Sequence, residues 1–434
     1  MESLIPRDIP LPFPAPFWLL EVLLIVSFGA HILFVGLMVG GAVTALVAEI
    51  KGLRNKDWDK IAQEIGKTIT VNKSLAVVLG VAPLLTINVA YTVQFYTANV
   101  LTAETWILVI PLAMIAFLLL YLHKYSWDTL RNRKGIHLSI LSLATAILLF
   151  IPTIFLANIN LMLYPEWWRT VDGFFDALFL PNVMPRYLHF LTATVAMTGL
   201  FLAKYMGRPA YFGKLELQSV TREQLVAGFY GMALAATGMQ FFFGPLIFFT
   251  LPAHVITMTT IWLLLAVIAL ASLTLWWLWK EITGTTVLER FWRIVGVLTV
   301  IVTLMIIVRH DIRETAVEPH RKLVAERTRE HIEQVKAAQN YFVMPGGLGG
   351  APMSPGAALF QRKCASCHAM DKRLVGPPLV ETAEIYAQNP AGIVEWSLNP
   401  GRRRMDYPPM APQVMPREDL MQIAEYILEA TGNQ

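Results

Sequence analysis

Long hydrophobic runs are the feature that most constrains this chain, because they fill most of its first 310 residues. A helix needs roughly 20 apolar residues to cross a bilayer, and eight stretches reach about that length. They lie at 17–48, 74–97, 104–123, 138–162, 184–206, 223–250, 254–279 and 288–310. With 55% hydrophobic and only 15% charged residues, an ordinary soluble protein is excluded. We therefore expect an all-α, polytopic membrane bundle of about eight transmembrane helices.

The distribution of Lys and Arg predicts how these helices are oriented. The loops after the first, third, fifth and seventh runs contain seventeen of them, whereas the N-terminus and the opposite loops contain only Arg7, Arg169 and Arg186. Cytoplasmic loops are enriched in Lys and Arg. We therefore expect both termini on the outer side of a bacterial inner membrane, which is the periplasmic side.

Composition divides the chain into three parts. We expect residues 1–310 to form the membrane bundle and residues 311–355 a charged helix followed by a Gly- and Pro-rich linker. Residues 356–434 then form a compact domain of their own.

The only two cysteines, Cys364 and Cys367, are followed directly by His368. This CxxCH spacing is the attachment motif for a c-type haem: two thiols bond one porphyrin, and the histidine lies under the iron. Read alone, the motif also fits a zinc or redox CxxC site. Three flanking features favour haem, namely a helix-like stretch before the motif, the sequence Gly376-Pro377-Pro378-Leu379, and Tyr407-Pro408-Pro409-Met410-Ala411-Pro412 ahead of an amphipathic helix.

Together these features resemble a class I cytochrome c. The resemblance implies one covalent haem c, a Pro377 carbonyl against the His368 ring, and Met410 as second axial ligand. Met405 and Met415 flank Met410 and remain alternatives. The basic run Arg402–Arg404 beside this loop is either a solvated surface, a docking patch or a contact to the haem propionates. Haem attachment is expected outside the cytoplasm, which agrees with the charge distribution.

Histidines within membrane spans are candidate functional residues, because ionisable groups are costly in the bilayer. His31 lies in the middle of the first run, whereas His189, His254 and His310 lie near outer ends of the fifth, seventh and eighth. All four are candidate ligands of b-type haem iron. The alternative is a core or interfacial histidine with a hydrogen-bond partner, which we favour for His123 and His137 at the cytoplasmic edges.

Three segments resemble helices of cytochrome bd quinol oxidase subunit I. They are Ser27–Phe34 with the helix after it, Arg186–Arg208, and Phe229–Ala233. The resemblance implies that His31 and His189 hold one or two non-covalent b haems. It places the family's methionine ligand near His254 and Met258, and the family's eighth-helix carboxylate near His310.

Two departures from that family bear on function. The third run, Thr105–Tyr121, has no glutamate, and the external loop associated with quinol binding shrinks to Phe249–Ala253. The missing glutamate argues against oxygen reduction, because the oxidases of that family have carboxylates in this helix. The short loop means that the family's quinone site cannot be carried over, so quinone binding between helices stays open and no residue is assigned to it.

The leading hypothesis is an electron-transfer cytochrome, an oxidoreductase or a subunit of one. It passes electrons between the quinone pool, or a membrane partner, and a periplasmic redox protein. Its partners are the lipid bilayer, these redox partners and other subunits of a respiratory complex, and no nucleic acid. Two alternatives are a terminal oxidase and a haem-free membrane anchor that carries a cytochrome c for a larger enzyme.

Overall fold

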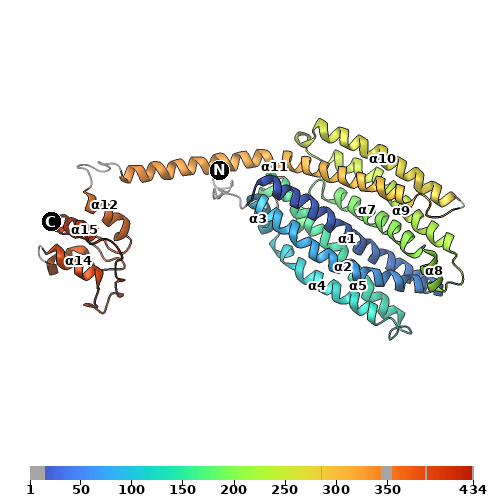
Figure 1. Ribbon diagram of the computed structural model, residues 1–434, viewed down its shortest axis with the longest axis horizontal. Helices are drawn as coiled ribbons and strands as arrows, with labels where there is room; N and C mark the ends of the chain where they lie inside the picture. Colours follow the sequence, from blue (N-terminus) through green and yellow to red (C-terminus); the bar gives the residue numbers. More distant parts are fainter. Residues whose placement is uncertain (1–14, 285, 344–353, 387–388, 433–434) are drawn as a thin grey trace. The chain divides into compact units, whose positions relative to one another are not determined.

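The computed structural model describes residues 15–284, 286–343, 354–386 and 389–432, which form helices and connecting turns without a strand (Figure 1). They fall into two compact units, Met1–Thr328 and Arg329–Gln434. The predicted linker at 344–353 and the proline-rich N-terminus, residues 1–14, lie outside the described residues.

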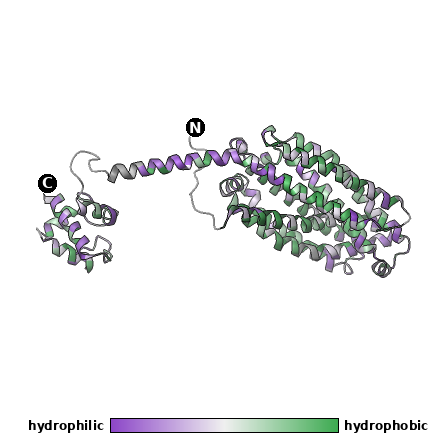
Figure 2. Ribbon diagram, turned by 45° about the horizontal axis from the view of Figure 1, so that its top comes forward, coloured by the Kyte–Doolittle hydropathy of each residue, from purple (hydrophilic) through white to green (hydrophobic). Residues whose placement is uncertain are grey.

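The first unit is a bundle of membrane-length helices. Seven helices are long and apolar enough to cross a membrane, and an eighth is obtained by joining α7 to α8, which is bent from it by 88°. The long helices are α1 (Phe17–Gly52), α2 (Lys56–Ala90), α4 (Ala103–Tyr125), α5 (Lys134–Leu163), α7 (Val183–Met206), α9 (Arg222–Phe249), α10 (Met258–Thr283) and α11 (Phe291–Val343). Figure 2 shows that apolar residues dominate them, except in the later part of α11, which is largely hydrophilic. The prediction of an all-α membrane bundle is confirmed.

Short elements mark the two ends of the bundle. At the end where α1 begins lie α3 (Thr92–Leu101), η2 (Pro165–Arg169), α6 (Phe174–Leu178) and η3 (Ala253–Val255). At the other end lies α8 (Pro209–Leu215) (Figure 1). We call these the α3 end and the α8 end. One hydrophobic core lies toward each end, the first around Ile65 and Met206 and the second around Phe95 and Leu161.

Two helices are longer than the hydrophobic runs indicated. The helix α2 begins at Lys56 rather than near residue 74, capped by the Asn55 side chain, which accepts the Asp57 N–H at 2.9 Å. Its first part is amphipathic, with Ile61 and Ile65 fully buried, so hydropathy alone does not detect it.

The helix α11 continues past residue 310 to Val343. Beyond that point Ala316 and Val317 are buried in the core at the α3 end. The expected boundary at 310 therefore falls inside this helix, and the first compact unit extends to Thr328.

Glycines of α1 let it approach α7 closely. A Cβ on Gly40 would overlap the Thr194 carbonyl and the Thr198 hydroxyl, and one on Gly36 would overlap the Met197 side chain. Small residues permit such backbone approach in membrane bundles. His31 precedes Gly36 by five residues, and His189 precedes Thr194 by five. Because both helices run from the α3 end to the α8 end (Figure 1), the two histidines lie at a similar depth.

Beyond the end of α11, the described residues of the second unit form four short helices: α12 (Pro355–Lys363), α13 (Leu379–Tyr386), α14 (Pro390–Leu398) and α15 (Arg417–Gly432). The helix α12 packs on α15 so closely that a Cβ on Gly356 would overlap the Gln422 backbone. Phe360 of α12 contacts Tyr426 of α15, with ring centroids 5.6 Å apart. This small core supports the loop that carries the two cysteines.

Candidate haem sites

The Cys364–His368 loop begins where α12 ends. The backbone N–H groups of Cys367 and His368 donate to the Cys364 carbonyl at 3.0 and 2.9 Å, which closes a tight turn containing both thiols. Burial, followed by the nearby Cys367 thiol, raises the pKa of the Cys364 thiol. Neither cysteine forms a disulfide. Both thiols therefore remain available for thioether bonds to a porphyrin.

The imidazole of His368 is held by the segment that follows the loop. Its Nδ1 lies 3.1 Å from the Pro377 carbonyl, and because a carbonyl only accepts, Nδ1 carries the proton. The lone pair is then on Nε2, the usual arrangement for a metal-ligating histidine. A Cβ on Gly376 would overlap the His368 ring, so the close approach requires glycine. The contact expected from the Gly376–Leu379 sequence is present.

The three methionines near the second ligand position have different surroundings. Met405 is 79% exposed. Met415 packs against the core of the unit. Met410 is half-buried in the loop after Tyr407, a buried residue whose ring lies 4.4 Å from the Arg373 guanidinium. These surroundings favour Met410 over the two alternatives.

The basic run beside this loop makes local contacts. Arg404 forms ion pairs with Glu381 and Asp406 at 2.5 and 2.8 Å. The Arg403 guanidinium lies 4.6 Å from the Trp396 ring. These contacts connect the methionine loop to α13 and α14.

Replacing Met410 by Ala should lower the reduction potential of haem c or make its iron high-spin, because a thioether ligand raises the potential. Redox titration of the c-type absorbance measures this, with Met405→Ala as the matched control. If Met410→Ala changes neither property, then Met415 is the better candidate.

In the membrane unit, His189 of α7 has an unusual environment. Its Nδ1 is buried and has no hydrogen-bond partner among the described residues. Buried polar atoms are nearly always satisfied, so such an atom calls for an explanation. Gly244 of α9 faces the ring without a side chain, where a Cβ would lie 3.9 Å from Cε1. Coordination to an iron ion would satisfy this unpaired nitrogen.

His31 of α1 has one defined proton. Its Nδ1 lies 2.8 Å from the Ala76 carbonyl of α2 and therefore donates to it. This leaves the Nε2 lone pair available to a metal. Gly80, one turn further along α2, is so close that a Cβ there would press on the His31 ring, 2.7 Å from Cε1.

The other predicted iron ligands have different surroundings. His310 accepts a hydrogen bond from Arg313 at Nδ1 (2.7 Å), and its Nε2 lies 3.8 Å from Glu21 Oε1. His254 is exposed on η3, and Met258 at the start of α10 is 74% exposed. His254 and Met258 are thus exposed, whereas His310 is half-buried between Arg313 and Glu21.

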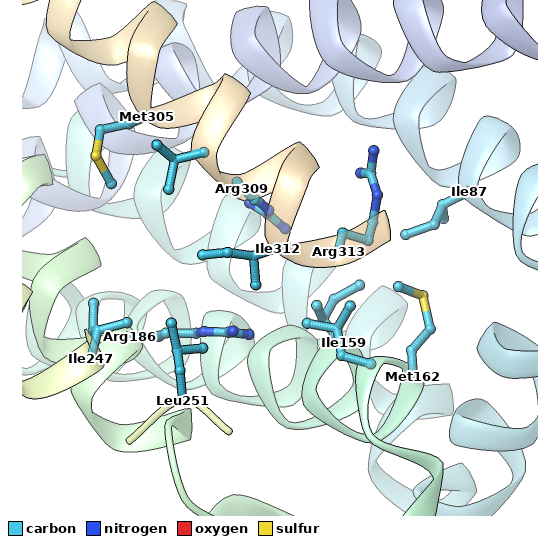
Figure 3. A pocket seen from close by; sticks show the side chains of 12 residues that line it. Ile87, Ile159, Met162, Arg186, Ile247, Leu251, Met305, Arg309, Ile312 and Arg313 are labelled. Carbon is cyan, nitrogen blue, oxygen red and sulfur yellow. The ribbon is translucent and has the colours of Figure 1, made fainter. Parts of the chain in front are cut away.

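An apolar cavity of about 140 Å³ lies near the α3 end of the bundle (Figure 3). Among its lining residues are Arg186 of α7 and Arg309 and Arg313 of α11, whereas no carboxylate lines it. Figure 3 shows these arginines among Ile87, Ile312 and other apolar side chains. Arg186 lies one helical turn before His189. The cavity therefore suits an anionic group attached to an apolar body.

No local sequence pattern indicates that these arginines form a group, or that Glu49, His123 and His137 form a buried cluster at the α8 end. From the sequence, Arg186 is only one of the three basic residues assigned to the N-terminus and the outer loops. Glu49 could have been noticed as a carboxylate inside a hydrophobic helix, which is itself a signal of function.

Comparison with known proteins agrees with both halves of this geometry. Residues 351–427 match the family model described as cytochrome c oxidase, cbb3-type, subunit III. The C-terminal unit is a cytochrome c domain. No curated protein matches the chain.

A solved structure, the bd oxidase from Geobacillus thermodenitrificans, is similar to this chain with a TM-score of 0.56 and 12% sequence identity. The match covers 76% of this chain and 98% of that one. The membrane unit therefore has a bd-oxidase-like fold, and the chain as a whole is a membrane protein with a haem-type electron-transfer domain.

Proposed function

We propose that this chain is a membrane-bound electron-transfer cytochrome in which b-type haem in the bundle exchanges electrons with one covalent haem c. One observation carries the proposal: the buried, unpartnered Nδ1 of His189 lies one helical turn from an arginine that lines an apolar cavity. An imidazole and an arginine pair match the two ends of a haem, its iron and its propionates.

The residues of the bundle fit this group in three respects. His189 offers a buried ligand atom, and His31 has its Nε2 lone pair free because Nδ1 donates to Ala76. Arg186, Arg309 and Arg313 supply positive charge without a carboxylate in the same cavity. Arginine binds carboxylates in bidentate geometry and remains charged when buried. When bound, the haem supplies an iron that is reversibly oxidised by one electron.

In the C-terminal unit, Cys364 and Cys367 would bond the porphyrin, and His368 and Met410 would hold its iron. The Pro377 carbonyl fixes the His368 ring and its proton, which would keep the Nε2 lone pair available to the iron. A His–Met pair raises the potential and suits an electron carrier.

The proposed orientation places both termini and the haem c unit on the periplasmic side of an inner membrane. The Lys- and Arg-rich loops lie at the α8 end, which would face the cytoplasm. The cavity and the outer ends of α7 and α11 would then face the periplasm. Electrons would pass between the quinone pool, or a membrane partner, and a periplasmic redox protein, and a tethered haem c meets its donor at high effective concentration.

A second candidate function, a terminal oxidase, is favoured only by the bd-oxidase-like fold. The helix α4 has a single carboxylate, Glu104, in its first turn, and the rest of that helix is apolar except for its last turn. Oxygen uptake coupled to oxidation of the chain would support this alternative.

The test is a count of haem types in the purified full-length chain, by pyridine haemochrome spectra and redox titration. We expect one covalent haem c and one or two extractable b haems per chain. A chain that contains only haem c would contradict the proposal and leave the bundle as an anchor.

A further inference from the structure

A second polar site lies at the α8 end of the bundle, away from the arginine cavity. Glu49 is in the last turn of α1, His123 in the last turn of α4 and His137 in the first turn of α5. Their side chains are 0%, 2% and 1% exposed. Three helices therefore each contribute one buried polar side chain to the same point.

The contacts within this cluster define which atoms face one another. His123 Nε2 lies 2.8 Å from Glu49 Oε2, and His137 Nδ1 contacts Glu49 Oε1. His137 Nε2 lies 2.9 Å from the His123 carbonyl and must carry the proton, because a carbonyl only accepts. The remaining nitrogen, Nδ1, is therefore the atom directed toward the carboxylate. One donor atom from each of the three residues lies within 4.8 Å of the others.

The residues around the cluster form a closed shell. Trp127 packs edge-on against both imidazoles, with ring centroids 5.4 and 4.7 Å from those of His123 and His137. Lys134 lies 3.9 Å from Glu49 Oε1, but its ammonium pairs with Asp59 at 2.6 Å. Lys134 is therefore shared between the two carboxylates and lies closer to Asp59, whereas the two imidazoles make the closest contacts to Glu49.

We propose that Glu49, His123 and His137 bind one divalent transition-metal ion, with Zn²⁺ as the representative ion. Two imidazoles and one carboxylate form a known zinc ligand set, with a fourth position for water. The bond from His137 Nε2 to a backbone carbonyl is the outer contact that metal-ligating histidines usually make. Because the ligands come from α1, α4 and α5, the ion would cross-link three helices, and it does not depend on the proposed haems.

The experiment uses the full-length chain in detergent, with metal content measured by mass spectrometry before and after chelation. We expect about one zinc per chain in addition to haem iron, restored when Zn²⁺ is added back to the chelated protein, and an increase in melting temperature on its return. X-ray absorption at the zinc edge should show nitrogen and oxygen ligands at roughly 2.0–2.1 Å.

Matched variants separate a ligand role from a packing role. Glu49→Gln and His137→Phe should lose the tightly bound zinc, whereas His137→Cys should retain it because a thiolate is also a zinc ligand. His331→Ala, outside the cluster, should bind as the wild type does. Size-exclusion chromatography in detergent reports whether each variant is folded, independently of its haem content. The proposal is overturned if the chelated wild type binds added Zn²⁺ no more tightly than Glu49→Gln, or if zinc-edge spectra show sulfur or solvent ligands only.

Discussion

Replacing His189 by Ala is expected to remove b-type haem absorbance from the membrane unit and leave haem c intact. The substitution deletes the buried Nδ1, for which no hydrogen-bond partner exists among the described residues, so no protein hydrogen bond at that atom is lost with it. All b-type absorbance should disappear if one such haem is bound, and about half of it if His31 holds a second. Reduced-minus-oxidised spectra and pyridine haemochrome analysis of the purified chain measure both haem types.

Leu188→Ala is the matched control for this variant, because Leu188 is the preceding residue of α7 and is exposed. It should retain both haem types. His31→Ala then distinguishes one b haem from two, since it should remove a separate population if two are present. Unchanged b-type absorbance in His189→Ala would contradict the ligand assignment.

Replacing both Cys364 and Cys367 by Ser should abolish covalent haem and leave the b-type absorbance unchanged. Without two thioether bonds, no porphyrin remains attached after denaturation. The hydrophobic core that the described residues of the C-terminal unit form is small, and a domain of this size rarely folds stably without a covalent or metal staple. We therefore also expect it to become sensitive to protease.

Haem staining after denaturing electrophoresis and limited proteolysis measure these two effects. Ser366→Ala is the matched control, because Ser366 lies between the cysteines without being part of the motif. A stained band in the double variant would show that the haem is attached elsewhere, and an equally protease-resistant domain would show that the small core is sufficient.

The fold could be predicted from the sequence because few backbone structures are stable inside a lipid bilayer. Each apolar run must satisfy its own backbone hydrogen bonds, and a helix does so. The start of α2 does not belong to a continuous apolar run, so hydropathy does not predict it. Its first turns mix charged and apolar residues, and the burial of Ile61 and Ile65 depends on neighbouring helices. Hydropathy measures composition along one segment and cannot report such packing.

Sites formed by a local motif could be predicted from the sequence, whereas sites formed by distant helices could not. The Cys364–His368 motif is local in sequence, so its spacing alone indicates the chemistry. The Glu49 cluster and the arginine cavity join helices that are far apart in the chain, and no local pattern predicts that they meet. His310 was a reasonable candidate by position, but whether its Nδ1 is free depends on Arg313, one turn away, and on the rotamers of both residues.

The glycine contact between α1 and α7 has a consequence for how this protein would vary among relatives. The spacing of His31 and His189 depends on the close approach of α1 to α7, because Gly40 has no side chain to hold its backbone away from the Thr194 carbonyl and Gly36 leaves room for the Met197 side chain. A larger residue at Gly40 would increase the separation of α1 and α7, and with it the distance between the two imidazoles. If haems were bound at His31 and His189, the distance between them would therefore depend on a residue of α1 that touches neither haem.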